Sequence, residues 1–136
     1  MHLIVLLLGS YSLPKTFEVD TVWVGSTVLE RCIDGDVTIA LSEPDAEGKV
    51  SGSYFYVSTE YGERGAYKGN YELRGTVQGN RYHLEQVALQ VNKARTDVTW
   101  RHGVMDLERT GDRLAGSWES RSNECFGTIE LTLQTD

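Results

Sequence analysis

Two cysteines carry the most specific chemistry in this chain of 136 residues. Cys32 follows the first strand pattern and Cys125 precedes the last one. Two cysteines alone cannot build a structural zinc site, and the three histidines do not lie at ligand spacing. If the first and last strands are neighbours in a closed barrel, the cysteines come within disulfide distance. We predict a Cys32–Cys125 disulfide, against the alternative of two free thiols, and with it an oxidising compartment, either periplasmic or secreted.

His102 is the candidate for a base or a polar ligand contact. It shares one face of a predicted strand with Trp100 and Val104, and an imidazole facing a lumen could accept a proton or a hydrogen bond. The alternative is a histidine tucked beneath the barrel rim with its nitrogens satisfied. His83 lies opposite the apolar Leu84 in its strand pattern, so we expect it at the surface.

The carboxylates Asp106 and Glu108 are two residues apart and would point to the same side of a strand. Paired carboxylates can do acid–base work. These two interleave with Met105 and Leu107, which indicates the solvated face of the strand. The sequence contains no clear catalytic, metal or cofactor motif, so we predict no cofactor, and an enzyme centred on His102 is the weakest functional hypothesis.

Large aromatic side chains fall on the apolar faces of several predicted strands. Such rings could surround a small apolar or aromatic ligand inside a barrel, or they could fill the barrel themselves. With His102, the candidate lumen residues are Trp23, Tyr54, Tyr67, Tyr71, Trp100 and Trp118.

A second candidate site is the loop over residues 58–65, the longest segment without strand character. Loops on a rigid barrel often carry function, and an inhibitor or immunity-type protein would present such a loop to an enzyme. Its candidate contact residues are Glu60, Tyr61, Glu63 and Arg64.

Strands must position all of these side chains. The clearest pattern covers residues 67–77, where Tyr71 and Leu73 alternate with charged and polar residues, as in a strand with one buried face. Within 82–91 the apolar phase switches after Leu84 to Val87, which indicates a bulge, and a similar switch occurs before Met105. The predicted strands cover residues 19–28, 36–41, 50–57, 67–77, 82–91, 98–107, 114–118 and 127–133.

The turns between these strands alternate in length. Short glycine-bearing turns at 45–48, 78–80 and 110–112 are typical of hairpins. Longer, more charged turns fall between them, and in a meander alternate turns lie at the same end. We therefore predict an all-β fold, an up-and-down antiparallel meander barrel of about eight strands, with an open sandwich as the alternative. The longer turns of its rim are 31–35, 58–65, 92–97 and 120–125.

The net charge and the N-terminal segment limit which partners and which location we expect for the protein. The formal net charge of −7 repels phosphate backbones, so we expect no nucleic-acid partner. Residues 1–16 are apolar at their start and form either a signal peptide or an extra strand, followed by a single barrel domain over 17–136. The apolar run is too short to span a membrane. If it belongs to the fold and the cysteines are reduced, the alternative location is the cytoplasm.

Several short motifs resemble those of known small barrels. Trp23-Val24-Gly25 and the glycine–x–aromatic strands Gly52-Ser53-Tyr54 and Gly116-Ser117-Trp118 are similar to the calycin group, the lipocalin-like and streptavidin-like barrels. The chain departs from the lipocalin glycine–x–tryptophan order, which is reversed here, and no positions map onto the biotin contacts of streptavidin. The resemblance implies a small barrel able to enclose a lumen, and it carries over no ligand and no catalytic residue.

The two cysteines add a second resemblance. In an uncharacterised domain of secreted bacterial proteins, a first-strand tryptophan–x–glycine precedes one cysteine and a second cysteine opens the last strand, as Cys125-Phe126-Gly127 does here. From all of these patterns the leading hypothesis is a non-enzymatic barrel that binds a small ligand in its lumen or at its long-loop rim. The alternative is an inhibitor or immunity-type protein that binds a protein partner through the rim loops.

Overall fold

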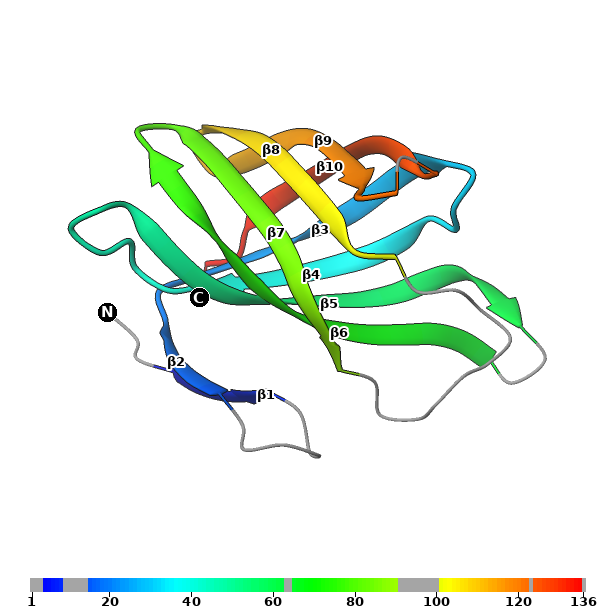
Figure 1. Cartoon of the computed structure of the whole chain (residues 1–136), viewed down its shortest axis with the longest axis horizontal. Helices are drawn as coiled ribbons and strands as arrows, with labels where there is room; N and C mark the ends of the chain where they lie inside the picture. Colours follow the sequence, from blue (N-terminus) through cyan, green and yellow to red (C-terminus); the bar gives the residue numbers. More distant parts are fainter. Residues whose placement is uncertain (1–3, 9–14, 63–64, 91–100, 123, 136) are drawn as a thin grey trace.

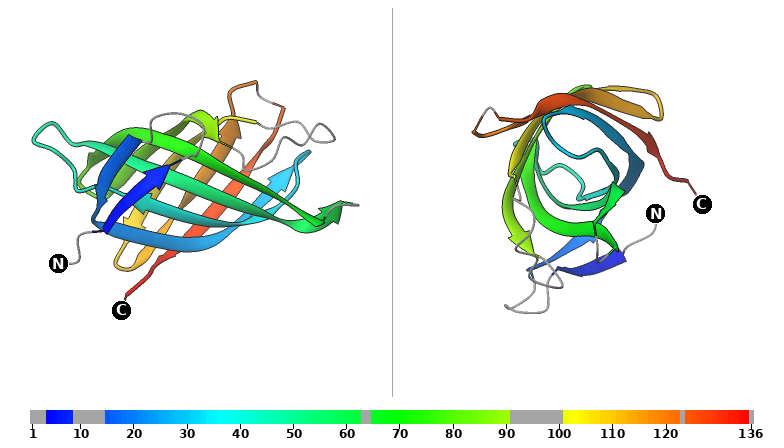
Figure 2. Two further views of the ribbon diagram at one scale, coloured as in Figure 1. Left: turned by 90° about the horizontal axis from the view of Figure 1, so that it is seen from below. Right: turned by 90° about the vertical axis from the view of Figure 1, so that its right-hand side faces the viewer.

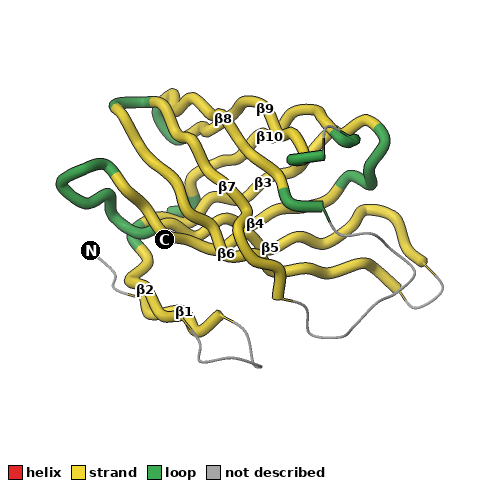
Figure 3. Tube along the Cα trace, viewed as in Figure 1, coloured by secondary structure: helices red, strands yellow, loops and turns green. Residues whose placement is uncertain are grey.

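A computed structural model describes residues 4–8, 15–62, 65–90, 101–122 and 124–135, with backbone only at 4–8, 15–16, 60–62, 65–66 and 90. The described residues are strands and connecting loops without a helix (Figure 3). The strands are β1 (Ile4–Leu8), β2 (Lys15–Val19), β3 (Thr21–Glu30), β4 (Gly35–Leu41), β5 (Lys49–Gly62), β6 (Gly65–Gln78), β7 (Arg81–Gln90), β8 (Gly103–Thr110), β9 (Arg113–Ser120) and β10 (Phe126–Leu133).

Eight of these strands close into a barrel in the order β10-β3-β4-β5-β6-β7-β8-β9 (Figure 1). Each strand pairs antiparallel with its sequence neighbour, and β10 returns to β3, where Ile129 faces Thr27 and Leu131 faces Gly25. Seen along its axis, the ring of strands is complete (Figure 2, right). The predicted eight-stranded meander is confirmed, including the contact between its first and last strands.

The alternation of apolar and polar residues explains the inner face. On β6, Tyr71 and Leu73 are buried while Lys68 and Arg74 are exposed, because successive side chains of a strand point to opposite faces. The same alternation on the other strands places aliphatic side chains in the middle of the barrel. This part of the core contains Val37, Ile39, Leu41, Leu84, Met105, Leu107, Leu114, Ile129 and Leu131.

The two ends of the barrel differ in their turns. At one end the glycines of the short turns, Gly48, Gly79 and Gly111, have φ angles of 81°, 61° and 61°, the left-handed conformation that glycine adopts without strain. At the other end lie the β3–β4 and β9–β10 turns, the last residues of β5 and β7 and the first residues of β6 and β8, which we call the long-loop rim (Figure 2, right). There β5 and β6 continue as a two-stranded hairpin beyond their barrel neighbours, with Tyr61 paired to Ala66. The prediction of a loop without strand character over 58–65 was therefore wrong, because the pairing of the two strands extends to Gly62 and Gly65.

A bulge on β7 accounts for the expected change of phase. Leu73 on β6 pairs with Gln86, and the preceding Glu72 pairs with Ala88, so Val87 is the extra residue. We expected Val87 to face inward, and this was wrong because the bulge turns its side chain to solvent. The inward phase resumes at Leu89, which is half-buried and packs against the core.

The second expected change of phase is not found within β8. This strand begins at Gly103, and its inward positions are Gly103, Met105 and Leu107 from the start. Val104, which we placed on the inner face, is half-exposed and lies opposite Glu85 and Glu119, which belong to the outer face. Positions 91–100, which contain the rest of the expected pattern, fall outside the described residues.

The N-terminal strands form a separate hairpin outside the barrel. β1 pairs with β2, and β2 lies beside β4 and β5 (Figure 1). The amide of Asp20 donates to the carbonyl of Leu41 over 2.8 Å, which fixes the passage from the hairpin into β3. Outward-facing Ala40 and Ser53 are buried on this side of the barrel. Two predictions about residues 1–16 stay open: a signal peptide that is removed from the mature protein, and an extra strand that belongs to the fold. A helix long and apolar enough to cross a membrane does not occur in the described part of the chain.

Candidate functional site

A pocket of about 250 Å³ opens at the long-loop rim. It lies above the aliphatic layer of the barrel, and its described walls come from β3, β5, β6, β7 and β9, from the β3–β4 turn and from Arg101. Most of its wall is aromatic or apolar. The lining residues are Leu29, Arg31, Cys32, Ile33, Tyr54, Tyr56, Tyr67, Tyr71, Gln86, Arg101 and Trp118.

Two buried tyrosines form one wall of the pocket. Tyr54 and Tyr71 lie opposite each other on β5 and β6, and their rings meet edge to face with 5.8 Å between centroids. Burial raises the pKa of both phenols above the ordinary value of 10.0, and the neighbouring tyrosines raise it further. Both hydroxyls therefore stay protonated at neutral pH, and neither makes a hydrogen bond within the described part of the chain.

Gln86 anchors the opposite wall. It is 1% exposed, and its Oε1 accepts hydrogen bonds from the amide of Gly103 over 2.7 Å and from Nε1 of Trp118 over 3.1 Å. A Cβ on Gly103 would come within 2.2 Å of the Trp118 indole, so only glycine leaves room for the ring there. One buried amide oxygen thus fixes the start of β8 and the orientation of the tryptophan.

The β3–β4 turn forms part of the mouth and is held from several sides. Tyr56 donates its hydroxyl hydrogen to the carbonyl of Ile33 over 2.7 Å, and the amide of Leu29 donates to Oδ1 of Asp34 over 2.6 Å. A Cβ on Gly35 would lie 2.0 Å from the Tyr56 ring. These contacts give the pocket a wall that is built before any ligand arrives.

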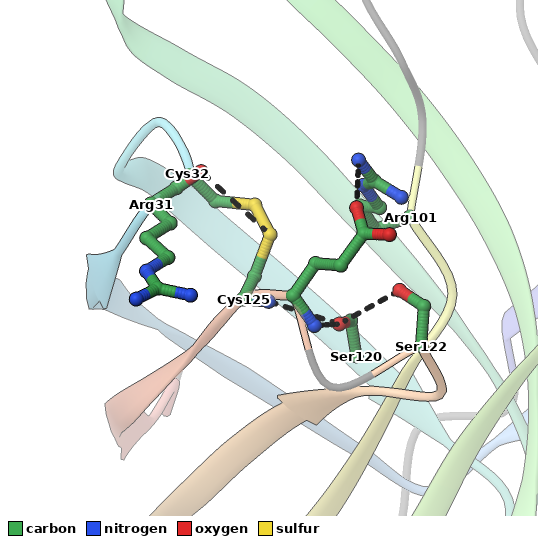
Figure 4. A network of polar contacts seen from close by, with 7 residues as sticks. Arg31, Cys32, Arg101, Ser120, Ser122 and Cys125 are labelled. Carbon is green, nitrogen blue, oxygen red and sulfur yellow. Dashed lines mark hydrogen bonds and ion pairs between the residues drawn. A yellow bond between two sulfur atoms is a disulfide. The ribbon is translucent and has the colours of Figure 1, made fainter.

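A disulfide joins this turn to the β9–β10 turn. Cys32 and Cys125 are bonded with 5.6 Å between their Cα atoms, which confirms the predicted pair (Figure 4). The hydroxyl of Ser120 accepts hydrogen bonds from the amides of Glu124 and Cys125, both at 3.1 Å, and so shapes the second turn. Cys32 itself lines the pocket, so the cross-link belongs to the wall of the pocket.

Two arginines line the mouth of the pocket. Arg101 forms an ion pair with Glu124 on the outer side of the disulfide, and the two side chains are 31% and 57% exposed. Arg31 is at the other side of the disulfide, in a left-handed conformation with φ of 66° (Figure 4). Among the described residues Arg31 has no carboxylate partner. The described part of the pocket lining contains no aspartate or glutamate.

The structure brings together four of the seven predicted lumen residues. Tyr54, Tyr67, Tyr71 and Trp118 line the pocket. His102 is half-buried and packs edge-on against Tyr71, with 5.5 Å between ring centroids, and it does not belong to the lining. Trp100 falls outside the described residues.

Trp23 lies toward the opposite end of the barrel, which it helps to close. It is fully buried, and its Nε1 donates to Thr21 over 3.0 Å. The guanidinium of Arg109 lies 5.0 Å from the centre of its ring, and Tyr82 meets the ring edge to face. At the short-turn end the aromatic residues therefore fill the barrel, whereas at the long-loop rim they surround a pocket.

The predicted rim contacts remain untested. Glu63 and Arg64 fall outside the described residues, and of Glu60 and Tyr61 the structure describes the backbone, at the end of β5. Their position on the two-stranded hairpin at the long-loop rim follows from the pairing of β5 with β6.

The polar groups considered for catalysis lie apart. Asp106 is on the outer face, as expected, where its Oδ1 is 2.7 Å from Nδ1 of the exposed His83 on β7. His102 makes no hydrogen bond or ion pair with a carboxylate of the described residues. Within the same part of the chain, no group of three His, Cys, Asp or Glu side chains could hold a metal ion.

Comparison of the chain with protein-family models, with curated proteins and with solved structures finds no match in any of the three. The argument about function therefore depends on the geometry of the site.

Several residues of the pocket were not predicted from the sequence. Gln86 carried a usable signal, because it continues the inward phase of Tyr82 and Leu84 and is polar. Arg31 gave none, since it is in a turn, where alternation does not apply. Arg101 lies between Trp100 and His102 in the predicted strand 98–107, so alternation assigned it to the opposite face. Tyr56 is two residues after Tyr54 in the predicted strand 50–57 and so shares its face, but its role in holding the β3–β4 turn required the structure.

Proposed function

We propose that this protein is a non-enzymatic binding barrel that holds a small ligand in the pocket at its long-loop rim. The observation that carries the proposal is a pocket walled by tyrosines and a tryptophan on a disulfide-bonded rim. A concave, mostly apolar site with a few fixed polar groups is the usual form of a small-molecule site. With about 250 Å³, this one suits a ligand of one or two rings.

The proposal includes the setting of the protein. A disulfide that joins two turns of the rim supports a place in the periplasm or outside the cell, because such bonds persist in oxidising compartments. The calycin-like identity of the barrel is part of the same proposal, supported by its closed eight-stranded meander.

A fluorescent probe tests the binding pocket. We expect the neutral dye N-phenyl-1-naphthylamine to bind one site per chain and to quench tryptophan fluorescence by energy transfer, with part of the quenching lost in Trp118→Leu. Leu29→Phe places a larger side chain into the pocket and should lower the affinity at least tenfold. Val28→Phe is the matched control, since the neighbouring Val28 is 67% exposed and points outward. Equal binding to both variants, or no binding to the unaltered protein, contradicts the proposal.

Native mass spectrometry gives an independent test. Protein purified from its own host should retain a small molecule of discrete mass that is lost on unfolding, and the Leu29→Phe variant should not retain it. A ligand carried equally by both proteins would place the binding site elsewhere.

A second candidate function uses the projecting hairpin of β5 and β6. These strands are 14 residues each and pair with one another beyond their barrel neighbours, at the end where Tyr61 and Ala66 face each other. A protruding two-stranded hairpin suits insertion into a partner, as in an inhibitor or immunity-type protein. Replacing residues 60–65 by a two-residue Asn-Gly turn should abolish binding of a protein partner and leave dye binding unchanged.

A further inference from the structure

The charged side chains of the described pocket lining are of one sign. The two charged side chains among its described residues, Arg31 and Arg101, are both cationic, although the whole chain carries 20 acidic and 13 basic residues. None of the described lining residues is acidic. The two arginines give the mouth positive charge, which the ion pair of Arg101 with Glu124 partly offsets.

Two acceptors of the pocket wall are already used by the protein. Oε1 of Gln86 accepts from both Gly103 and Trp118, and the carbonyl of Ile33 accepts from Tyr56. In contrast, the O–H groups of Tyr54 and Tyr71 have no partner among the described residues. These phenols can donate or accept a hydrogen bond, whereas the guanidinium groups of Arg31 and Arg101 only donate, so donors outnumber acceptors among the described lining residues.

We infer that the ligand is a small aromatic carboxylate, with its ring among Tyr54, Tyr71 and Trp118 and its carboxylate at the mouth between Arg31 and Arg101. This rests on the proposed function and names the chemistry of its ligand. A carboxylate supplies acceptors only, and charge-assisted hydrogen bonds from arginine are the strong ones. The rings bind through burial of apolar surface and edge-to-face contacts.

Glu124 takes part as the competitor of the ligand. Its carboxylate pairs with Arg101 in the free protein, where both groups are partly exposed and such pairs contribute little to stability. A ligand carboxylate that approaches Arg101 replaces Glu124 or shares the guanidinium with it. Removing the Glu124 charge should therefore tighten the binding of an anionic ligand, whereas removing either arginine charge should weaken it.

A pair of probes with the same shape separates charge from ring recognition. We would titrate 2-naphthoate and its uncharged analogue 2-naphthamide by calorimetry, at low and at high salt. The acid is expected to bind at least tenfold more tightly than the amide, with an affinity that falls as salt rises. Arg31→Gln and Arg101→Gln should each weaken binding of the acid at least fivefold and leave the amide unchanged. Glu124→Gln should strengthen binding of the acid severalfold.

The control variant is Arg74→Gln, which removes the same charge from the outer face of β6, where Arg74 is 60% exposed. Arg74→Gln should change neither the affinity for 2-naphthoate nor the affinity for 2-naphthamide. If acid and amide bind equally, or if both arginine variants bind the acid like the unaltered protein, the inference of an anionic ligand is overturned and the binding pocket stands. If neither probe binds, the inference is overturned, and the pocket proposal then fails only if the dye also does not bind or binds equally to the Leu29→Phe and Val28→Phe variants.

Discussion

The indole of Trp118 on β9 packs against the backbone of Gly103 on β8, where a Cβ would come within 2.2 Å of the ring. Gly103→Ala should therefore displace the indole and break its bond to Gln86. We expect a loss of about 1–3 kcal/mol in the free energy of unfolding, as overpacked cores show. Urea unfolding followed by circular dichroism measures the loss, and the tryptophan emission spectrum compared with that of the Trp118→Leu variant measures the change at the indole of Trp118.

The control for this prediction is a double-mutant cycle. In a Trp118→Leu background the clash is removed, so Gly103→Ala should cost much less. An equal cost in both backgrounds would mean that the alanine acts on the backbone of β8 and not on the indole.

Gln86 gives a second prediction about the same wall. Gln86→Met keeps the volume of the side chain but leaves the amide of Gly103 and Nε1 of Trp118 without their acceptor. Because each unpaired buried donor costs about 1–3 kcal/mol, we expect a total loss of about 2–6 kcal/mol for the two donors. Chemical denaturation measures it, and Gln78→Met on the exposed end of β6 is the control. A loss below 0.5 kcal/mol, roughly the size of a surface effect, would contradict the role of Gln86.

The sequence predicted the strands well, and the reason is their period. Alternation fixes which residues face inward wherever one face of a strand is buried, so β6 and the pairing of β10 with β3 could be anticipated. The alternation is interrupted at Val87, where the bulge adds one residue. The change of phase could be read from the sequence, but the inserted residue could not be distinguished from its neighbours.

The location of the pocket could not be predicted in the same way. Trp23 and Trp118 both lie on inner faces of strands, so alternation treats them alike. The stagger between strands places Trp23 beneath Arg109 at the short-turn end and Trp118 beside Gln86 at the long-loop rim. Stagger depends on the pairing register of all eight strands, and a single strand carries no information about it.

The disulfide gives a third prediction, on stability and on the pocket together. Cys32 and Cys125 are 93 residues apart, so in the chain-entropy model the bond stabilises the fold by about 4–5 kcal/mol. The free energy of unfolding of the double variant Cys32→Ser/Cys125→Ser should be lower by that amount, so the variant should unfold at a lower urea concentration. It should also bind the dye more weakly, because Cys32 belongs to the pocket wall.

The chemical state of the cysteines provides the control. Thiol titration under denaturing conditions should give no free thiol without reductant and two with it. Two free thiols in protein from an oxidising compartment would contradict the bond. Adding reductant to the double variant should have no further effect on its stability.

The buried tyrosines give a fourth prediction, on alkaline stability. Burial raises the pKa of Tyr54 and Tyr71 above 10.0, so above that pH the unfolded chain loses protons that the folded protein keeps. Their contribution to stability is fully present below pH 10 and is lost as the pH rises. Each tyrosine should lower the free energy of unfolding by about 1.4 kcal/mol per pH unit above 10. In the double variant Tyr54→Phe/Tyr71→Phe this slope should fall by about 2.8 kcal/mol per unit, the sum of the two tyrosine contributions. The measurement is urea unfolding between pH 9 and 11.5, and an unchanged slope would mean that both phenols ionise in the folded barrel.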